Sequence, residues 1–182
     1  MGMAISVPRY TVEDLKRFPE DGNRYELLDG VLLVTPGPGS AHQEIATRLL
    51  LALGPVVHST GLGHLAASGT VSLPPLTLLE PDLLVYPARF APGTPWPDIT
   101  EHWLAVEVLS RGSRTYDREF KRDAYLAIGV REVWLVDQRD KSVEVCRARG
   151  AGMVVTDAFT WTVADAGISV VIDVRALFEG LL

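Results

Sequence analysis

The fold is decided by the stretch Trp103-Leu104-Ala105-Val106-Glu107-Val108-Leu109-Ser110. Its apolar run is almost continuous and rich in β-branched residues, which predicts a strand buried on both faces. Alternation puts Glu107 on one face with Trp103, Ala105 and Leu109. An unpaired carboxylate is costly away from water, so we expect Glu107 to be protonated, paired with a cationic side chain or bound to a cation.

A second stretch repeats this arrangement. Leu79-Glu80-Pro81-Asp82-Leu83-Leu84-Val85-Tyr86 carries Asp82 immediately before an apolar run. Alternation puts Asp82 on the face of Leu84 and Tyr86, and the sequence leaves open whether this face coincides with that of Glu107. Two such strands side by side would bring two acids together, which suggests a hard metal ion.

The remaining segments alternate between helix and strand signals. A short helix is expected after Thr11, an Asp29-Gly30 turn joins two apolar runs in a hairpin, and a helix opened by a Ser40/Gln43 capping box ends at Gly54-Pro55. Strands are expected at 64–73, 132–137, 142–147, 153–161 and 168–174, with a last helix at 175–181. This order predicts an α/β (α+β) fold in one domain, residues 1–182, with a mixed sheet flanked by helices, an N-terminal hairpin and a C-terminal strand extension.

Composition restricts the classes of protein to which the chain can belong. The chain has 182 residues, of which 47% are hydrophobic and 22% charged, as in an ordinary globular domain with a full core. No apolar run is long enough to span a membrane, and the single Cys146 makes a reducing cytoplasm the simplest location. One cysteine and four scattered histidines offer no zinc-ligand spacing. The net charge of −6 argues against nonspecific coating of nucleic acid but not against a nuclease.

A helix is expected after the Glu107 strand, capped at Thr115 or Asp117 and closed by Gly129. Its predicted buried stripe comprises Tyr116, Phe120, Ala124, Ala127 and Ile128, and Lys121 lies beside it, able to reach back toward the strand. Basic residues gather at its start: Arg111, Arg114, Arg118, Lys121 and Arg122. They could contact phosphate, or they could form ion pairs with the neighbouring acids Asp117, Glu119 and Asp123.

Two further polar residues lie near apolar stripes. Alternation puts Glu26 on the face opposite Tyr25 and Leu27, so solvent exposure is its simplest explanation. His42 falls at the inward edge of the stripe of the helix that follows Ser40. A histidine there can be a packed neutral residue or part of a site.

Asp82, Glu107 and Lys121 therefore form the constellation of interest. Mg²⁺ prefers a few acidic oxygens and keeps several waters for substrate phosphate, and such a cation can stabilise the charge that develops on a cleaved phosphodiester. An ammonium group beside the attacking water would orient it or neutralise the developing phosphorane.

The motifs that carry a resemblance follow in order along the chain. They are Tyr25–Gly30, His42-Gln43, Pro81-Asp82, Val106–Ser110, Tyr116–Lys121 with Tyr125, and Gly129–Asp137. Together they resemble the Uma-type family of predicted restriction endonucleases, which is assigned to the PD-(D/E)XK nuclease superfamily with its restriction endonuclease-like fold. The resemblance covers about residues 10–150, with a nuclease core at about 24–138.

The resemblance implies a Mg²⁺- or Mn²⁺-dependent endonuclease that hydrolyses DNA, with Asp82 and Glu107 as catalytic acids and metal ligands. Leu109 occupies the position of the usual lysine, and Lys121 matches the displaced lysine of the family. Glu26 and His42 match recurrent positions and are expected to support the site. A homodimer is a further expectation.

Two other functions fit some of these observations. A nuclease-fold binding or assembly module without catalysis would explain the acidic charge, the missing lysine after Glu107 and the apolar C-terminal strands. A glycosidase could also use two carboxylates, but the chain lacks the run of aromatic residues expected of a sugar cleft.

Overall fold

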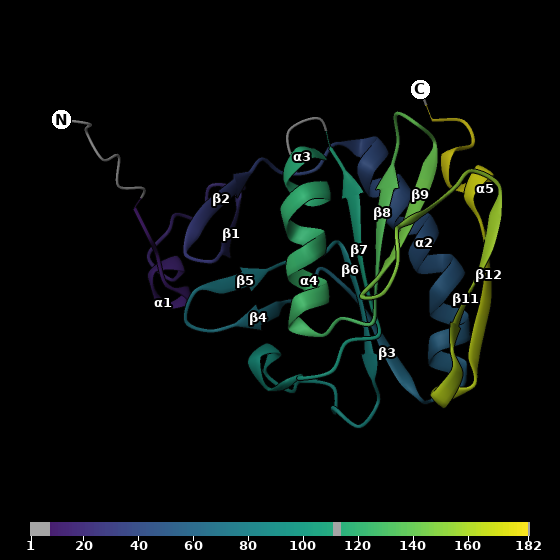
Figure 1. Cartoon of the computed structure of the whole chain (residues 1–182), viewed down its shortest axis with the longest axis horizontal. Helices are drawn as coiled ribbons and strands as arrows, with labels where there is room; N and C mark the ends of the chain where they lie inside the picture. The colour runs from purple at the N-terminus through teal and green to yellow at the C-terminus, as the bar shows by residue number, and fades with distance from the viewer. Residues whose placement is uncertain (1–7, 111–113, 182) are drawn as a thin grey trace.

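A six-stranded mixed sheet forms the centre of the molecule (Figure 1). The computed structural model describes residues 8–110 and 114–181. The strand order is β10-β9-β8-β7-β6-β3, and only β7 and β8 among these neighbours run parallel. The strands are β3 (Gly63–Ala67), β6 (Leu83–Pro87), β7 (Leu104–Leu109), β8 (Glu132–Asp137), β9 (Ser142–Arg147) and β10 (Met153–Val155). Every residue of β6, β7 and β8 is buried, as their continuous apolar runs predict.

A four-stranded antiparallel sheet lies beside the central sheet, in the order β2-β1-β5-β4. Its strands are β1 (Arg24–Leu28), β2 (Val31–Thr35), β4 (Val71–Leu73) and β5 (Thr77–Leu79). Asp29 and Gly30 adopt φ values of 48° and 77° between β1 and β2, which is the left-handed geometry that a two-residue hairpin turn requires. The predicted N-terminal hairpin is confirmed.

Two layers cover the central sheet on opposite faces. Helix α2 (Ser40–Ser59) packs on one face with the two-stranded sheet β11 (Ala158–Val163) and β12 (Ile168–Asp173) and with α5 (Val174–Phe178). Helix α4 (Arg122–Ile128) packs on the other face, where Tyr125 joins the odd-numbered residues of β7 and β8. Helix α1 (Val12–Leu15) begins at Thr11 with the capping box that its sequence predicts. The predicted α+β class is thereby confirmed.

The connection between the parallel strands β7 and β8 carries residues of the candidate active site described below. β7 leads through α3 (Arg114–Tyr116), a π-helical turn (Asp117–Lys121) and α4 to its parallel neighbour β8. Even-numbered residues of β7 face α2, whereas Ala105 and Leu109 face the α4 layer. Glu107 therefore projects toward α4.

Three predicted elements have other boundaries than expected, among them the strand at 153–161, which is divided between β10 and β11 of two different sheets. Helix α2 is capped by the backbone of Gly39 without a side-chain hydrogen bond, and it continues through Gly54-Pro55 to Ser59. Pro55 is tolerated because the carbonyl that loses its donor belongs to Leu51, whose side chain is 69% exposed, on the solvent side of the helix. The strand predicted at 64–73 is two strands, β3 and β4, which belong to different sheets.

The helix after β7 also differs from its prediction. It begins at Arg114, so the expected cap residues Thr115 and Asp117 lie inside the helical segment, and residues 111–113, including Arg111, lie outside the described residues. The π-helical turn rotates its faces, so that Asp117, Lys121 and Tyr125 are buried while Tyr116 and Phe120 are exposed. The predicted stripe is therefore wrong at Tyr116, Phe120 and the exposed Ala127, whereas Gly129 closes the helix at φ 107° as predicted.

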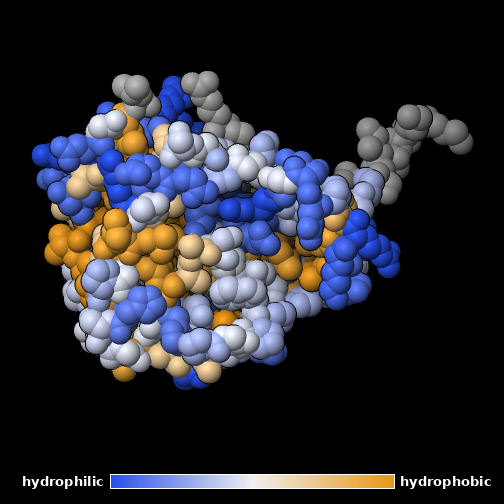
Figure 2. Space-filling model, turned by 180° about the vertical axis from the view of Figure 1, so that it is seen from behind, coloured by the Kyte–Doolittle hydropathy of each residue, from blue (hydrophilic) through white to orange (hydrophobic). Residues whose placement is uncertain are grey.

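Apolar side chains gather on the face seen from behind, on the side of the molecule that carries α2 and β12 (Figure 2). The strongly exposed large apolar residues of these two elements are Leu51 and Val171. In residues 8–110 and 114–181, no helix has the length and hydropathy needed to cross a bilayer.

Candidate active site

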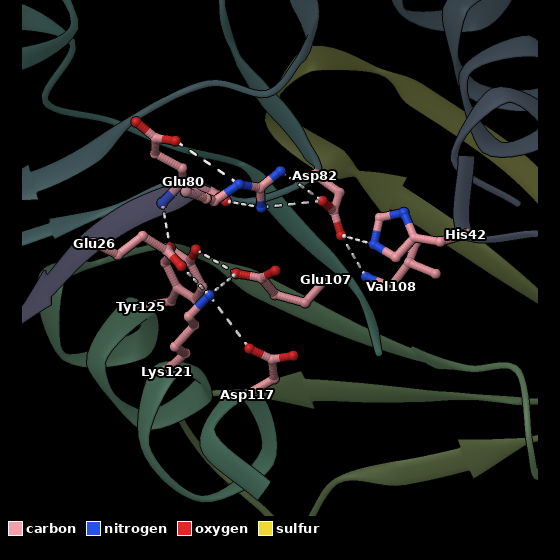
Figure 3. A network of polar contacts seen from close by, with 10 residues as sticks. Glu26, His42, Glu80, Asp82, Glu107, Val108, Asp117, Lys121 and Tyr125 are labelled. Atoms are coloured by element: carbon pink, nitrogen blue, oxygen red, sulfur yellow. Dashed lines mark hydrogen bonds and ion pairs between the residues drawn. The ribbon is translucent and has the colours of Figure 1, made fainter. Parts of the chain in front are cut away.

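One cavity of about 500 Å³ is lined by four of the expected site residues, His42, Asp82, Glu107 and Lys121. It lies where the hairpin, the start of α2, the ends of β6 and β7 and the π-helical turn converge. Its charged and imidazole lining residues are Arg24, His42, Glu80, Asp82, Glu107, Asp117 and Lys121. Figure 3 shows that these side chains come from separate segments and point toward one another.

Asp82 and Glu107 are brought together by the pairing of β6 with β7. The antiparallel register pairs Leu83 with Val106, and one further step places Asp82 opposite Glu107. Residues that face each other across an antiparallel pair project to the same side. Their faces therefore coincide, and both carboxyl groups line the same cavity.

Both oxygens of Asp82 are engaged. Oδ1 accepts hydrogen bonds from the two terminal nitrogens of Arg24 at 3.2 and 3.1 Å, and Oδ2 accepts one from the backbone N–H of Val108 at 2.8 Å. His42 Nε2 lies 3.1 Å from Oδ2 (Figure 3). Burial raises the pKa of the Asp82 carboxyl, but His42, Arg24 and the Val108 N–H outweigh burial and leave the pKa below its ordinary value. Asp82 is therefore ionised at neutral pH.

Glu107 is held from the helix side. Its Oε1 accepts a 2.7 Å hydrogen bond from the Tyr125 hydroxyl and lies 3.5 Å from Lys121 Nζ. Burial raises the pKa of Glu107 well above its ordinary value, and the nearby carboxylates Asp117 and Asp82 add to this shift although Lys121 opposes it. The pKa values of Asp82 and Glu107 are thus shifted in opposite directions.

Lys121 is a buried ammonium surrounded by acids. Its Nζ lies 2.6 Å from Glu26 Oε2 and 3.3 Å from Asp117 Oδ1, in addition to its contact with Glu107. Burial lowers the pKa of Lys121, but the charges of Glu107, Glu26 and Asp117 raise it by more, so the net shift is upward. Lys121 is therefore a permanent cation at neutral pH and acts as a hydrogen-bond donor.

Two backbone-anchored contacts fix the outer part of this network. The backbone N–H of Glu80 donates to Glu26 Oε1 at 2.8 Å, and Arg24 donates to the carbonyl of Glu80 at 2.9 Å. Because Glu80 directly precedes the Pro81-Asp82 pair, the hairpin strand β1 is tied to the segment that carries Asp82. On β1, Arg24 contacts Asp82 and Glu26 contacts Lys121.

The sequence-predicted site residues therefore converge: Glu26, His42, Asp82, Glu107 and Lys121 all belong to one contact network. The expected solvent exposure of Glu26 is wrong, because its side chain is fully buried against Lys121.

Sequence reasoning missed the positions of Arg24, Asp117 and Tyr125 in the network. Asp117, Lys121 and Tyr125 recur at four-residue intervals, which is the spacing of one helical face and the signal that could have revealed this set.

The basic residues of the helix start are mostly engaged in ion pairs. Arg118 Nη2 lies 2.8 Å from Asp137 Oδ2, and Arg114 contacts the same carboxylate and Asp140. Arg122 pairs with Asp123 at 2.8 Å. The ion-pair interpretation of this patch therefore holds for its described residues, but Arg114 and Arg118 pair with Asp137 and not with the expected acids Asp117, Glu119 and Asp123.

The chemistry of the donor set fits a divalent cation at Asp82 and Glu107. Among the described residues, no three Asp, Glu, His or Cys side chains form a ready ligand cluster. Mg²⁺, however, commonly takes only one or two protein carboxylates and completes its coordination with water and substrate oxygens. Burial and the neighbouring carboxylates raise the pKa of Glu107, and a bound cation would favour its ionised form.

The arrangement of sheets and helices is that of a nuclease-like α+β fold. A crystal structure described as "a putative nuclease belonging to DUF820", from Anabaena variabilis, is similar with a TM-score of 0.78 and 18% sequence identity, covering 95% of this chain and 99% of that chain. At this identity the likeness concerns the fold. The model of the Uma2 family, described as "Putative restriction endonuclease", matches residues 12–168. The chain therefore belongs to the Uma2 family, as its motifs predict. No curated protein matches its sequence.

Proposed function

We propose that this protein is a metal-dependent endonuclease that hydrolyses phosphodiester bonds of DNA. The observation that carries the proposal is the meeting of two strand-borne acids, Asp82 and Glu107, with the helix-borne cation Lys121 in one cavity. Membership of a family described as restriction endonucleases supports it, as does the description of the Anabaena variabilis protein as a nuclease.

Asp82 and Glu107 would hold the metal ion, Mg²⁺ or Mn²⁺. When bound, that ion would supply positive charge to the phosphodiester and favour attack by water. Lys121 has a protonated amine, so it donates a hydrogen bond to the attacking water or to a phosphate oxygen and does not remove a proton. Arg24, which lines the same cavity, offers a second cation to the phosphate.

Three residues act as positioning residues in this proposal. Glu26 orients the Lys121 amine, and Tyr125 orients the Glu107 carboxyl through its hydroxyl. His42 holds the Asp82 carboxylate from α2. Such outer contacts fix the rotamers of the acids and the lysine before substrate arrives, which is how a rigid site lowers an activation barrier.

The displaced lysine is compatible with this function. Leu109 is buried in the core at the position where a lysine would follow Glu107 by two residues. The Lys121 amine approaches Glu107 from the adjacent helix instead. A side chain that arrives from a different backbone position can place the same group beside the acids.

DNA cleavage by the purified full chain tests the proposal. Supercoiled and linear DNA are incubated with Mg²⁺ or Mn²⁺, and nicking is followed on gels. We expect metal-dependent nicking that Asp82→Ala abolishes and Asp157→Ala, a change of an exposed acid outside the cavity, leaves intact. Absence of cleavage of any nucleic acid, or cleavage that survives in Asp82→Ala, would contradict the proposal.

A second candidate is a nuclease-fold module that binds or assembles without catalysis. The engagement of both Asp82 oxygens and the enclosure of Lys121 by three carboxylates favour it, because such a network is already satisfied. Exposed apolar residues on the C-terminal strands, Met153, Val154 and Val171, would suit a homodimer or another assembly. Calorimetry separates the two: no Mg²⁺ or Mn²⁺ binding at millimolar concentration favours the module, and binding that Glu107→Gln weakens favours the enzyme.

A further inference from the structure

The π-helical turn inverts the usual distribution of side chains. Over residues 116–121, the charged Asp117 and Lys121 are almost fully buried, while the aromatic Tyr116 and Phe120 are 44% and 48% exposed. Large aromatic residues are normally buried before charged ones. The inversion places two rings on the surface directly beside the candidate active site.

The two rings form a pair. Their centroids are 5.3 Å apart with an interplanar angle of 42°, which is a common separation for interacting aromatic side chains. Each ring limits the motion of its neighbour, so the pair offers a fairly rigid apolar surface. Rigid aromatic surfaces bind planar ligands with little loss of conformational entropy.

Tyr116 also lines a small recess of about 180 Å³. The opposite wall is the apolar strand β2, with Leu32, Leu33 and the half-exposed Val34. Thr35, Asp117 and Lys121 line both this recess and the main cavity. The recess therefore adjoins the proposed catalytic centre: β2 and Tyr116 supply apolar and aromatic side chains, whereas Asp117 and Lys121 supply charged ones.

We propose that this recess, with the Tyr116–Phe120 pair, receives an unpaired nucleobase of the substrate by stacking. This inference rests on the proposed function and specifies its substrate: a nucleic acid with single-stranded or extrahelical bases at the cleavage site. The phosphate of the same nucleotide would face Lys121 and Arg24 in the main cavity.

The size and chemistry of the recess support this ligand. It is smaller than the cavities that take drug-sized molecules, and it combines the apolar side chains of β2 and the Tyr116 ring with the polar Thr35, Asp117 and Lys121, which suits a single heterocycle with polar edges. Aromatic side chains stack on any base because every base has a π face, whereas paired bases in a duplex already stack on each other. The protein should therefore distinguish single-stranded from paired nucleic acid without distinguishing one base from another.

Fluorescence of 2-aminopurine tests the inference directly. The probe is a DNA 12-mer with one central 2-aminopurine, used single-stranded and as a duplex, with the full-length protein and Ca²⁺ in place of Mg²⁺; denaturing gels check that the probe stays intact. We expect tighter binding of the single strand with quenched fluorescence. Tyr116→Leu should weaken single-strand binding roughly ten-fold, since stacking contributes about 1–3 kcal/mol per base, and should leave duplex binding unchanged.

Two control variants separate stacking from other effects. Tyr116→Phe retains the ring and should retain the quench, while Leu51→Ala removes a more exposed apolar side chain from α2 and should change nothing. Circular dichroism checks that each variant is folded. If Tyr116→Leu binds each probe with the same affinity as Tyr116→Phe and Leu51→Ala, the inference is overturned while the nuclease proposal stands. The same holds if the wild type binds the duplex more tightly than the single strand. If the wild type binds neither probe and cleaves no nucleic acid, both fail.

Discussion

Lys121 is the residue on which the charge balance of the site depends. It is the cation that contacts Glu26, Asp117 and Glu107 together, and its side chain is 3% exposed. Removing one partner from a buried ionic cluster leaves uncompensated charge, which costs far more than the cluster itself contributes. Lys121 therefore has a structural role in addition to its proposed catalytic one.

Lys121→Met should lower the free energy of unfolding by about 3–5 kcal/mol at neutral pH, because three carboxyl groups lose their common cation. Urea unfolding followed by circular dichroism measures the change. Lys141→Met, at an exposed hairpin turn, is the matched control and should stay within about 0.5 kcal/mol of wild type. Similar losses of unfolding free energy in both variants would mean that the buried lysine contributes no more to stability than an exposed one.

Tyr125→Phe removes the hydroxyl that donates to Glu107 Oε1 and retains the ring in the core. We expect divalent-metal affinity, measured by calorimetry, to fall about 10- to 100-fold, as for other losses of a partner that orients a metal ligand. Tyr86→Phe, on β6 in the same core layer but not in the network, should bind metal as the wild type does. Unchanged affinity in Tyr125→Phe would exclude this orienting role.

At the scale of elements, the π-helical turn shows where sequence periodicity fails. Tyr116 and Phe120 fit an apolar stripe at helical spacing, and propensity alone would bury them. The ion pairs of Lys121 with Glu26, Asp117 and Glu107 hold the charged face inward instead. These contacts link the helix to β1 and β7. The four-residue spacing of Asp117, Lys121 and Tyr125 marks a common face, but partners elsewhere in the chain decide that this face, and not the aromatic one, is buried. By contrast, β7 and β8 were predictable, because continuous apolar runs identify buried strands wherever they pack.

Gly129→Ala should destabilise the protein by about 1–2 kcal/mol, because φ 107° is unfavourable for residues with a Cβ atom. A Cβ at this position meets no heavy atom within 4 Å, so the loss would be conformational and not steric. Thermal unfolding measures it. Gly54→Ala, inside α2 where a Cβ would make only ordinary van der Waals contacts, should not destabilise the protein. Equal losses would contradict a conformational cause.

For the whole molecule, local signals predicted the class of fold and the two acids, but not the burial of Glu26. The hairpin itself is encoded by Asp29-Gly30, and its packing against the crossover helix depends on residues about half the chain away. Asp82 and Glu107 could be recognised because each is a charged residue beside or within an apolar run, where an unpaired charge is costly. Arg24 could not, since an arginine at the start of a surface hairpin normally faces solvent.

Stability toward acid should depend on His102, which is 4% exposed. Burial lowers its pKa from 6.5 to about 4, although Glu101 slightly opposes this shift. Between these pH values the unfolded chain takes up a proton that the folded chain refuses, so stability falls as pH drops from 6.5 to 4 and the loss is complete below 4.

His102 accounts for at most about 3 kcal/mol of this loss of stability, because of the size of the difference in its pKa between the folded and the unfolded chain. Urea titrations at pH 7 and pH 4 measure it: His102→Gln should lose less stability between these pH values than wild type, while the exposed His58→Gln should behave as wild type. A pH dependence that is the same in all three proteins would contradict the assignment.

The contact between Glu26 and Lys121 joins positions 95 residues apart. During synthesis, Asp82 and Glu107 leave the ribosome before the helix that carries Lys121 and Tyr125 has left it. A nascent chain that stops short of this helix holds its acids without their cation and has no assembled centre. The proposed nuclease would thus be harmless to cellular nucleic acid until most of the polypeptide has been made and has docked.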